Sequence, residues 1–591
     1  MAAFSGQRTV FRRLSVATVA TALTLAHSSI ALAQTPKIAP PYQDRLMIEL
    51  ANPGEGRPTQ FAWGPEGRLY VATNGQGVFS YRYDRLTGLL SDRKLAVREV
   101  RGGIGIAFHR DRDERWNMYL TVNDDSVQEG AIVKLNDTNR NGVWGEVNQG
   151  ELRVRIVQRI PIGDHAVDQL IVRGNSLFVG IGRRTINGRR GPWSMGSHSD
   201  DPNDRGFWGG GTGFSWGDSP FHGTIAWIEN LNAVVNETDS ANVYSPNEVH
   251  DRDFYQTNAR PYRIILNQEP TAGKLLIHSA GTRNPFGLAL DRMGNLWFTN
   301  NFNRTVTTGD GKANDSERGD PVQADLRKGV HDQLFKARWG ADYGYHDDNW
   351  RGAPFSFMMP ENLLHVGRVF STTFDNLFNN GPYVLHNPAD PDGLGPNSSA
   401  NGISFFYAGG LPRELENNAF IVRFSGEMVD SLRQRVDYRD LVAVHPETGR
   451  VRRVAFDFNA PLAVLWDGGQ RLLIGDYGNG RIYTIRPALR RIGVRAEVTR
   501  PRANGNVIAE VVLKNTGDLP LSDIALTGAV LRDRRPGNAF PIPVLPLASG
   551  ESSRTIRLEF PRTVPSGPAI LEIRGRYNGI QFTSAIRTVV P

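Results

Sequence analysis

Asp164 and His165 stand just before an apolar segment that begins at Gln169-Leu170. A histidine side chain has a pKa near neutrality, so His165 could exchange a proton with a substrate at physiological pH. The alternative is a turn residue whose ring is hydrogen-bonded to a neighbouring carbonyl. Both interpretations of His165 stay open on these residues alone.

A second polar pair, Arg283-Asn284, directly precedes Pro285. Both side chains are hydrogen-bond donors, and the guanidinium group of arginine is always charged. The pair could contact a bound ligand. It could equally form a rim turn that Pro285 holds in place.

Oxygen-bearing side chains alternate at Asp137, Asn139 and Asn141, and Gly142 follows them. Hard cations such as Ca²⁺ favour such ligands, and the central glycine is typical of a calcium loop. Asn148 occupies the position at which a complete loop has a bidentate glutamate. These residues therefore predict either a weak calcium site or a plain turn.

The elements that must position these residues follow one pattern: a short apolar segment, a turn with Gly or Asp, and a second apolar segment. Each copy predicts a β-hairpin, and several copies are followed by a further apolar strand. Six units of four strands predict a six-bladed β-propeller, whose radial closure protects the sheet edges. The copies lie at residues 61–71, 105–120, 169–179, 287–298, 402–422 and 462–476.

The residue pattern of the sequence changes after Pro487. Residues 490–591 contain alternating strands separated by turns, which predict a β-sandwich of immunoglobulin-like size. This region has no histidine and no cluster of catalytic residue types. We expect it to be an accessory domain beside a propeller at residues 34–487.

The first 33 residues have the features of a secretory signal peptide. Three arginines precede an apolar stretch that ends in Ala31-Leu32-Ala33. The stretch is interrupted by polar residues and is too weak to span a bilayer. We therefore expect a periplasmic or secreted protein without a membrane span; export by the Sec or the Tat pathway stays open.

Composition excludes several classes of protein. Removal of the signal peptide takes away three arginines and no acidic residue, so the formal charge of +7 falls by three to +4. Such a balance, without a long Lys/Arg run, argues against nucleic-acid binding. The absence of cysteine rules out disulfides and thiol chemistry. The many turns implied by 63 glycines and 35 prolines fit an all-β chain.

Residues 60–487 resemble the soluble pyrroloquinoline quinone (PQQ) sugar dehydrogenase family, also called the glucose/sorbosone dehydrogenase family. The resemblance lies in three phrases: Asp164-His165 before Gln169, the segment Thr282-Arg283-Asn284-Pro285-Phe286-Gly287, and Asp332-Gln333-Leu334. It implies a six-bladed propeller that oxidises a carbohydrate or polyol with PQQ and calcium.

The resemblance also implies roles for individual residues. His165 matches the general base that removes the sugar hydroxyl proton while a hydride passes to the quinone, and Asp164 would orient the substrate or the imidazole. Arg283 and Asn284 match the pair that contacts the quinone, and they would stabilise charge that develops on its oxygen.

The chain lacks three cationic residues that the family uses to bind the quinone. Ala408, Ala460 and Leu462 stand where the family has a Lys and two Arg that bind the quinone carboxylates. Unpaired, partly desolvated carboxylates are costly, so PQQ binding would require cations elsewhere. Candidates in rim loops are Arg183, Arg184 and Arg338.

Three functions follow as hypotheses. The first is a quinoprotein-like dehydrogenase acting on a sugar or polyol. The second is a hydrolase or lyase that keeps the histidine base without PQQ. The third is a binding propeller that holds a glycan or a partner, since one fold hosts unrelated functions.

Overall fold

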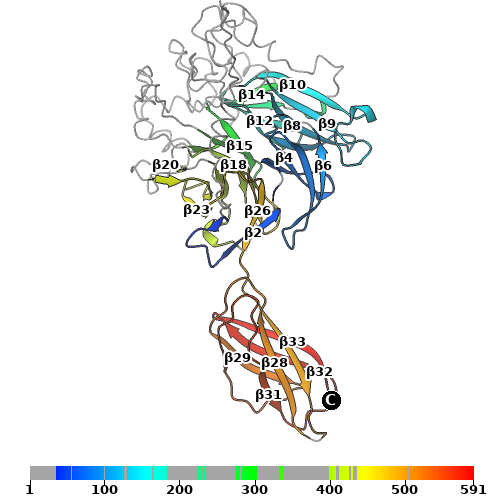
Figure 1. Ribbon diagram of the computed structural model, residues 1–591, viewed down its shortest axis with the longest axis vertical. Helices are drawn as coiled ribbons and strands as arrows, with labels where there is room; N and C mark the ends of the chain where they lie inside the picture. The colour runs from blue at the N-terminus through cyan, green and yellow to red at the C-terminus, as the bar shows by residue number, and fades with distance from the viewer. Residues whose placement is uncertain are drawn as a thin grey trace, which may run out of the picture. The chain divides into compact units, whose positions relative to one another are not determined.

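The computed structural model shows an all-β chain (Figure 1). No helix in its described part is long and apolar enough to cross a membrane. The predicted signal peptide lies outside the described residues. These residues span 35–591 except for 53, 55, 99, 125–128, 163–164, 183–222, 229, 234–274, 280–281, 302–331, 338–393, 395–397, 408–410, 425–426, 430–434 and 504.

Six antiparallel sheets are arranged as the blades of a propeller. The innermost strand of each blade packs against that of the next blade, and the sixth packs against the first. This closed ring confirms the predicted six-bladed propeller. The innermost strands are β3 (Pro58–Trp63), β7 (Ile106–Arg110), β11 (Val167–Arg173), β15 (Pro285–Leu290), β18 (Ala400–Phe405) and β24 (Pro461–Trp466).

The remaining strands complete the blades outward from the channel. Blade 1 adds β4 (Leu69–Thr73), β5 (Gly77–Tyr83) and β6 (Leu90–Val97), and blade 2 adds β8 (Trp116–Asp124), β9 (Glu129–Asn136) and β10 (Arg153–Pro161). Blade 3 adds β12 (Ser176–Ile181), β13 (Thr224–Ile228) and β14 (Leu275–Ser279), and blade 4, within the described residues, adds β16 (Leu296–Asn300) and β17 (Gln333–Lys336). Blade 5 adds β19 (Ala419–Arg423), β22 (Asp440–Val444) and β23 (Val451–Phe456), and blade 6 adds β25 (Leu472–Asp476) and β26 (Arg481–Pro487).

A separate hairpin is formed by β20 (Glu427–Val429) and β21 (Arg435–Asp437), and short 3₁₀ turns lie at Pro65–Gly67, Val147–Gln149, Leu231–Ala233 and Arg413–Leu415.

Early residues of the chain close the ring. Strand β2 (Leu46–Asn52) pairs with β26 at the outer edge of blade 6, and β1 (Lys37–Ile38) pairs with β23 of blade 5. Blades 5 and 6 are thus each built from both ends of the propeller sequence. This pairing protects the outer edges of both sheets with backbone hydrogen bonds.

Blade strands are apolar on both faces because each blade packs between two others. All five residues of β4, and likewise of β16, β19 and β25, are buried. Separate apolar clusters fill the seams between consecutive blades. The repeats are visible in the sequence for this reason: buried strands read as apolar runs between polar turns.

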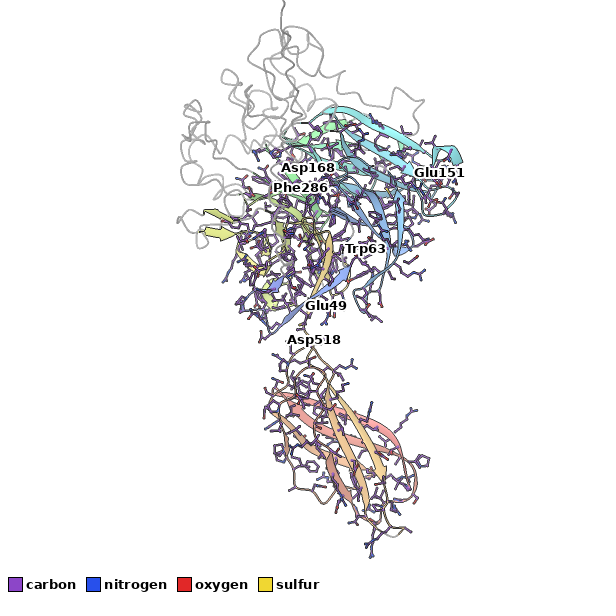
Figure 2. All side chains as sticks on the ribbon, viewed as in Figure 1. Glu49, Trp63, Glu151, Asp168, Phe286 and Asp518 are labelled. Atoms are coloured by element: carbon purple, nitrogen blue, oxygen red, sulfur yellow. The ribbon has the colours of Figure 1, made fainter. Side chains whose placement is uncertain are left out.

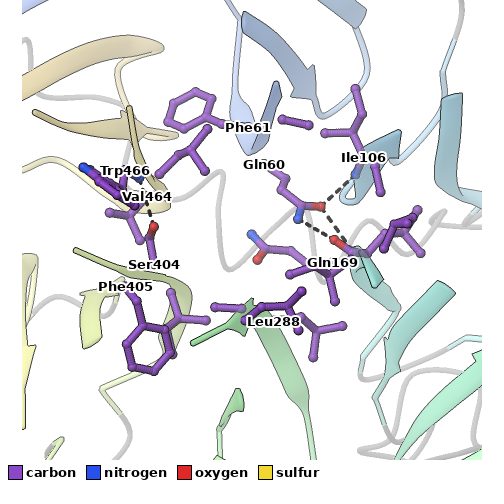
Figure 3. A pocket seen from close by; sticks show the side chains of 18 of the residues that line it. Gln60, Phe61, Ile106, Gln169, Leu288, Ser404, Phe405, Val464 and Trp466 are labelled. Carbon is purple, nitrogen blue, oxygen red and sulfur yellow. Dashed lines mark hydrogen bonds between the residues drawn. The ribbon is translucent and has the colours of Figure 1, made fainter. Parts of the chain in front are cut away.

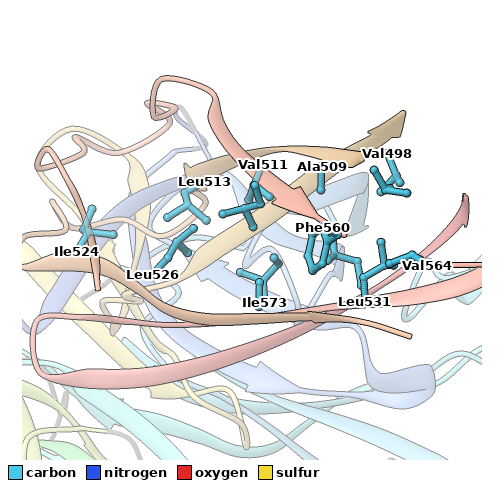
Figure 4. Packing of buried hydrophobic residues seen from close by; sticks show 14 of the residues in the cluster. Val498, Ala509, Val511, Leu513, Ile524, Leu526, Leu531, Phe560, Val564 and Ile573 are labelled. Carbon is cyan, nitrogen blue, oxygen red and sulfur yellow. The ribbon is translucent and has the colours of Figure 1, made fainter. Parts of the chain in front are cut away.

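The C-terminal residues form a second compact unit, a sandwich of two antiparallel sheets. Side chains alternate between core and solvent along its strands, and a single apolar cluster fills the interior (Figure 4). This confirms the predicted β-sandwich. Its sheets contain β27 (Ile492–Thr499), β28 (Val507–Asn515) and β31 (Ile556–Phe560), and β30 (Ile542–Val544), β29 (Ile524–Leu531), β32 (Gly567–Tyr577) and β33 (Ile580–Val590).

Candidate functional site

Two of the polar segments singled out in the sequence meet at one mouth of the propeller channel. His165 lies two residues before β11, and Arg283-Asn284 directly precedes β15. The inner strands of a propeller run in the same direction, so their first residues gather at one end of the channel. Because β11 packs against β15, the two segments belong to neighbouring blades and share one side of this mouth.

Gly182, directly after β12, marks the point at which His165 and Asn284 meet. A Cβ atom placed on Gly182 would lie 2.3 Å from Cβ of His165 and 2.4 Å from Oδ1 of Asn284. Both separations are shorter than any ordinary contact between heavy atoms of this kind. A glycine is therefore required here if the two side chains are to lie side by side.

The backbone around His165 is held by neighbouring strands. Oδ1 of Asn123 accepts a hydrogen bond from the amide of Val167 (2.9 Å), and its Nδ2 donates to the carbonyl of Val167 (3.0 Å). The amide of Gly182 donates to the carbonyl of Ala166 (3.0 Å). His165 itself is half-buried, and Asp164 lies outside the described residues.

Arg283 and Asn284 are almost completely buried and are fixed by an asparagine. Oδ1 of Asn300 accepts hydrogen bonds from both backbone amides, each at 3.1 Å. Nη1 of Arg283 donates to the carbonyl of Asn301 (3.2 Å), and the amide of Asn301 donates to the carbonyl of Asn284 (3.0 Å). The pair is thus a rigid turn, and the side-chain amide of Asn284 lies beside His165 over Gly182.

An apolar cluster surrounds Leu462, one of the positions at which the family resemblance called for a cation. Phe286 from blade 4 packs with Leu462 and Tyr477 from blade 6, and all three are buried. Ile104, just before blade 2, and Phe424, just after β19, pack against them. Residues from four blades therefore converge on an apolar surface, which does not fit the carboxylates of PQQ.

The second cation position is also occupied by a structural contact. The amide of Ala460 donates to Oδ1 of Asp476 (2.7 Å), and a Cβ atom on Gly478 would lie 3.0 Å from Cβ of Ala460. The side chain of an arginine at residue 460 would thus have to extend from a turn that is already closely packed around the Cβ atom. The third position, Ala408, lies outside the described residues.

Cations near this mouth come from elsewhere in the chain. Arg283 is one, and the exposed Arg57 lies over the ring of Tyr477, with 5.4 Å between the guanidinium carbon and the ring centroid. Arg183, Arg184 and Arg338 lie outside the described residues. The residues that the structure describes thus fit a neutral ligand better than a tricarboxylate bound in the family's manner.

The candidate calcium loop is folded by its own side chains. Oδ2 of Asp137 accepts from the amide of Gly142 (2.8 Å), and Oδ1 of both Asp137 and Asn139 accepts from the amide of Asn141 (3.1 and 2.9 Å). The buried carboxylate of Glu151, which the sequence did not single out, accepts from the amide of Thr138 (3.0 Å). Within the described residues no group of three acidic or histidine side chains is placed to hold a metal ion. Calcium binding at this loop stays a prediction.

Deeper in the channel, two glutamines link three blades (Figure 3). Gln60 of β3 donates to the carbonyl of Leu170 (2.8 Å) and accepts from the amide of Ile106 (2.7 Å). Gln169 of β11 donates to the carbonyl of Thr59 (2.9 Å). Both glutamines line a cavity of about 710 Å³ that residues of all six innermost strands surround. The cavity lies further from the first residues of the innermost strands than His165 does.

Asp168 is a buried residue that sequence reasoning missed. It lies in β11 three residues after His165, and burial raises the pKa of its carboxyl well above the ordinary value. The available signal was an acidic residue two positions before the apolar segment that begins at Leu170. Figure 2 labels Asp168 and Phe286 within the propeller.

Comparisons with known proteins concern the fold. No protein-family model and no curated protein sequence matches the chain. A calcium structure of Carbohydrate-Active Enzymes Family AA12 from Trichoderma reesei is 15% identical, with a TM-score of 0.44, over 76% of this chain and 97% of that one. The PQQ-bound aldose sugar dehydrogenase of Streptomyces coelicolor is 14% identical, with a TM-score of 0.39, over 76% of this chain and 100% of that one. The pyranose dehydrogenase PQQ domain of Coprinopsis cinerea is 10% identical, with a TM-score of 0.42, over 76% and 97%.

Proposed function

We propose that the propeller is a sugar- or polyol-oxidising enzyme whose site lies at the channel mouth beside His165. The observation that carries the proposal is the meeting of His165 and Asn284 over Gly182. These are the residues that match the general base and the ligand-contacting amide of the resembled family. Their proximity supports a common site, because two unrelated turn residues would have no need of a shared glycine.

In this proposal His165 takes the proton of the substrate hydroxyl at near-neutral pH. Asn284 and the buried guanidinium of Arg283 would donate to the oxygen of the hydride acceptor on which negative charge develops. Their fixed backbone keeps that arrangement preorganised. Oxidation of the carbon also requires a hydride acceptor, and PQQ is the acceptor that the resemblance implies. The surroundings of Leu462 and Ala460 do not fit the family's mode of holding it, so a quinone would be held by other residues.

A second function is favoured by the apolar cluster of Phe286, Leu462 and Tyr477. A mouth without the family's cations suits a hydrolase or lyase that uses His165 as a base on a neutral substrate. A binding role without chemistry would use the same mouth. In each case we propose an exported, periplasmic or secreted protein, with the C-terminal sandwich taking no part in the chemistry.

The test is an assay of the purified chain lacking residues 1–33 on a panel of aldoses and polyols. Dye-linked oxidation is measured with PQQ and Ca²⁺, with Ca²⁺ alone, and with neither. Oxidation that requires PQQ and is lost in His165→Ala supports the dehydrogenase. Hydrolysis or elimination without PQQ, lost in the same variant, supports the second function, and activity unaffected by His165→Ala contradicts both.

A further inference from the structure

The cavity of about 710 Å³ extends to the end of the channel opposite His165. The innermost strands begin at the His165 mouth, whereas the cavity is lined by their middle and final residues. Leu290 and Trp466 end β15 and β24, and Arg292 follows β15; all three line the cavity and are partly or fully exposed. This far cavity therefore opens at the opposite mouth.

An apolar plug separates the far cavity from the His165 mouth. Phe286 packs with Leu462, and the two come from blades 4 and 6, which are not neighbours, so this packing must span the channel. Ile104, two residues before β7 of blade 2, packs against the same cluster. Residues two positions apart in a strand face the same side. The next residues on that side in these three blades line the cavity: Ile106, Leu288 and Val464. A ligand in the far cavity would thus enter from the opposite mouth.

One buried polar group faces the far cavity at its inner end. Gln169 is only 3% exposed, and Figure 3 shows its side-chain amide reaching toward the middle of the cavity. Its Nε2 donates to the carbonyl of Thr59 (2.9 Å), and a carbonyl can only accept, so the orientation of the amide is fixed. Among the described residues no donor meets its Oε1. A hydroxyl group on a ligand would supply that donor.

The neighbouring glutamine has no such capacity to spare. Oε1 of Gln60 accepts from the amides of Ile106 (2.7 Å) and Leu170 (3.2 Å), and its Nε2 donates to the carbonyl of Leu170 (2.8 Å). Its amide thus links three blades and serves the structure. Gln169 is the one of the two that is left to bind a ligand.

The other side chains give the far cavity apolar walls and an aromatic rim. Tyr407 packs edge to face with Trp466 and stacks on Phe405, with 5.9 Å between ring centroids in each pair. The hydroxyl oxygen of Tyr407 accepts from the amide of Arg292 (2.6 Å), and that of Ser404 accepts from the amide of Trp466 (2.9 Å). The walls contain Ile106, Leu170, Leu288, Ile403 and Val464.

Charge is confined to the rim and includes both signs. Arg292 is exposed, and the neighbouring carboxylate of Asp291 accepts from Nδ2 of Asn295 (2.8 Å) and from Nε1 of Trp297 (2.9 Å). The inner part of the cavity therefore offers no charged side chain to an ionic ligand. A sugar is also unsuited to it, because most of its hydroxyl groups would face apolar walls without partners.

We propose that the far cavity is a second ligand site, separate from the His165 mouth, for a neutral aromatic molecule that bears a hydroxyl group. The hydroxyl donates to Oε1 of Gln169, and the ring packs against the apolar walls. The volume lies within the range of small-molecule sites, which combine mostly apolar walls with a few placed polar groups.

The test is equilibrium dialysis of the chain lacking residues 1–33 against 2-naphthol, which is neutral at pH 7. We expect saturable binding of one molecule per chain. Naphthalene, which has no hydroxyl group, should bind about fivefold more weakly, as expected for the loss of one hydrogen bond. Absence of saturable binding, equal binding of naphthalene, or displacement of 2-naphthol by glucose would each overturn the proposal.

Variants locate the bound molecule. Gln169→Leu should bind naphthalene and 2-naphthol equally well, because the acceptor is gone. Ile171→Trp should block both by filling the cavity, and it leaves Gln169 in place, so it decides the matter if Gln169→Leu does not fold. Val147→Trp is the control, since Val147 is 64% exposed and does not line the cavity. Unchanged binding in Ile171→Trp would contradict the proposal.

The His165→Ala variant distinguishes the two ends of the channel. It should bind 2-naphthol as tightly as the wild type, because the plug of Phe286, Leu462 and Ile104 lies between His165 and the far cavity. Weaker binding would place the molecule at the His165 mouth and overturn the proposal. This readout needs no sugar oxidation, so it stands or fails independently of the proposed function.

Discussion

His165 and Asn284 come from neighbouring blades, and their side chains meet over Gly182, where a Cβ atom would lie 2.3 Å from one and 2.4 Å from the other. Neither residue is near the other in sequence. The contact exists because β11 and β15 are adjacent inner strands that begin at the same channel mouth.

His165→Ala should reduce turnover by about 10²–10⁴-fold, because a general base typically contributes that much. Its melting temperature should stay close to that of the wild type, since a half-buried ring contributes little packing. His109 is the matched control: it is buried, and its Nε2 lies 3.0 Å from Oδ1 of Asn175. His109→Ala should lower stability by about 1–3 kcal/mol and leave turnover unchanged. If instead His109→Ala lost turnover and His165→Ala lost stability, His109 would be the catalytic histidine and His165 the structural one.

Gly182→Ala should reduce turnover by at least about tenfold, because the added methyl group must displace His165 or Asn284. Gly528 in the sandwich is the control, since a Cβ atom there meets no atom within 4 Å. Steady-state kinetics and circular dichroism of both variants check this prediction. A fully active, normally folded Gly182→Ala protein would show that the contact is not needed.

Leu462→Arg should lower the free energy of unfolding by about 2 kcal/mol or more, because it places a charge against Phe286 and Tyr477. We expect no gain in PQQ affinity, measured by absorbance titration. Leu462→Met is the control, since it keeps an apolar side chain of similar volume. Tighter PQQ binding by Leu462→Arg at unchanged stability would instead reveal a quinone pocket of the family's kind.

His278 should make the propeller less stable in acid. Its pKa is lowered from 6.5 to about 3, mainly by burial and then by the charge of Arg173. The unfolded chain therefore binds a proton below about pH 6.5 that the folded protein cannot, so stability falls as the pH drops through this range. His278→Phe should lose this dependence, because phenylalanine does not titrate. Thermal unfolding between pH 4 and 8 checks this, and equal slopes for both proteins would contradict it.

The sequence by itself determined the six hairpins and the sandwich. Buried blade strands such as β4 and β25 read as apolar runs bounded by Gly or Asp turns, and this pattern needs no knowledge of tertiary contacts. The resemblance to a known family singled out His165 and Arg283-Asn284, and both stand just before such runs. These are local properties of the chain, and local patterns survive in the sequence.

Only the tertiary structure decided what surrounds those residues. The contact of His165 with Asn284, the burial of Asp168 and the packing of Leu462 against Phe286 each join different blades or depend on their closure. No periodicity in the sequence encodes which side chains face each other across a channel. These contacts arise when six sheets close into a ring, because closure brings distant segments together and excludes water from the space between them.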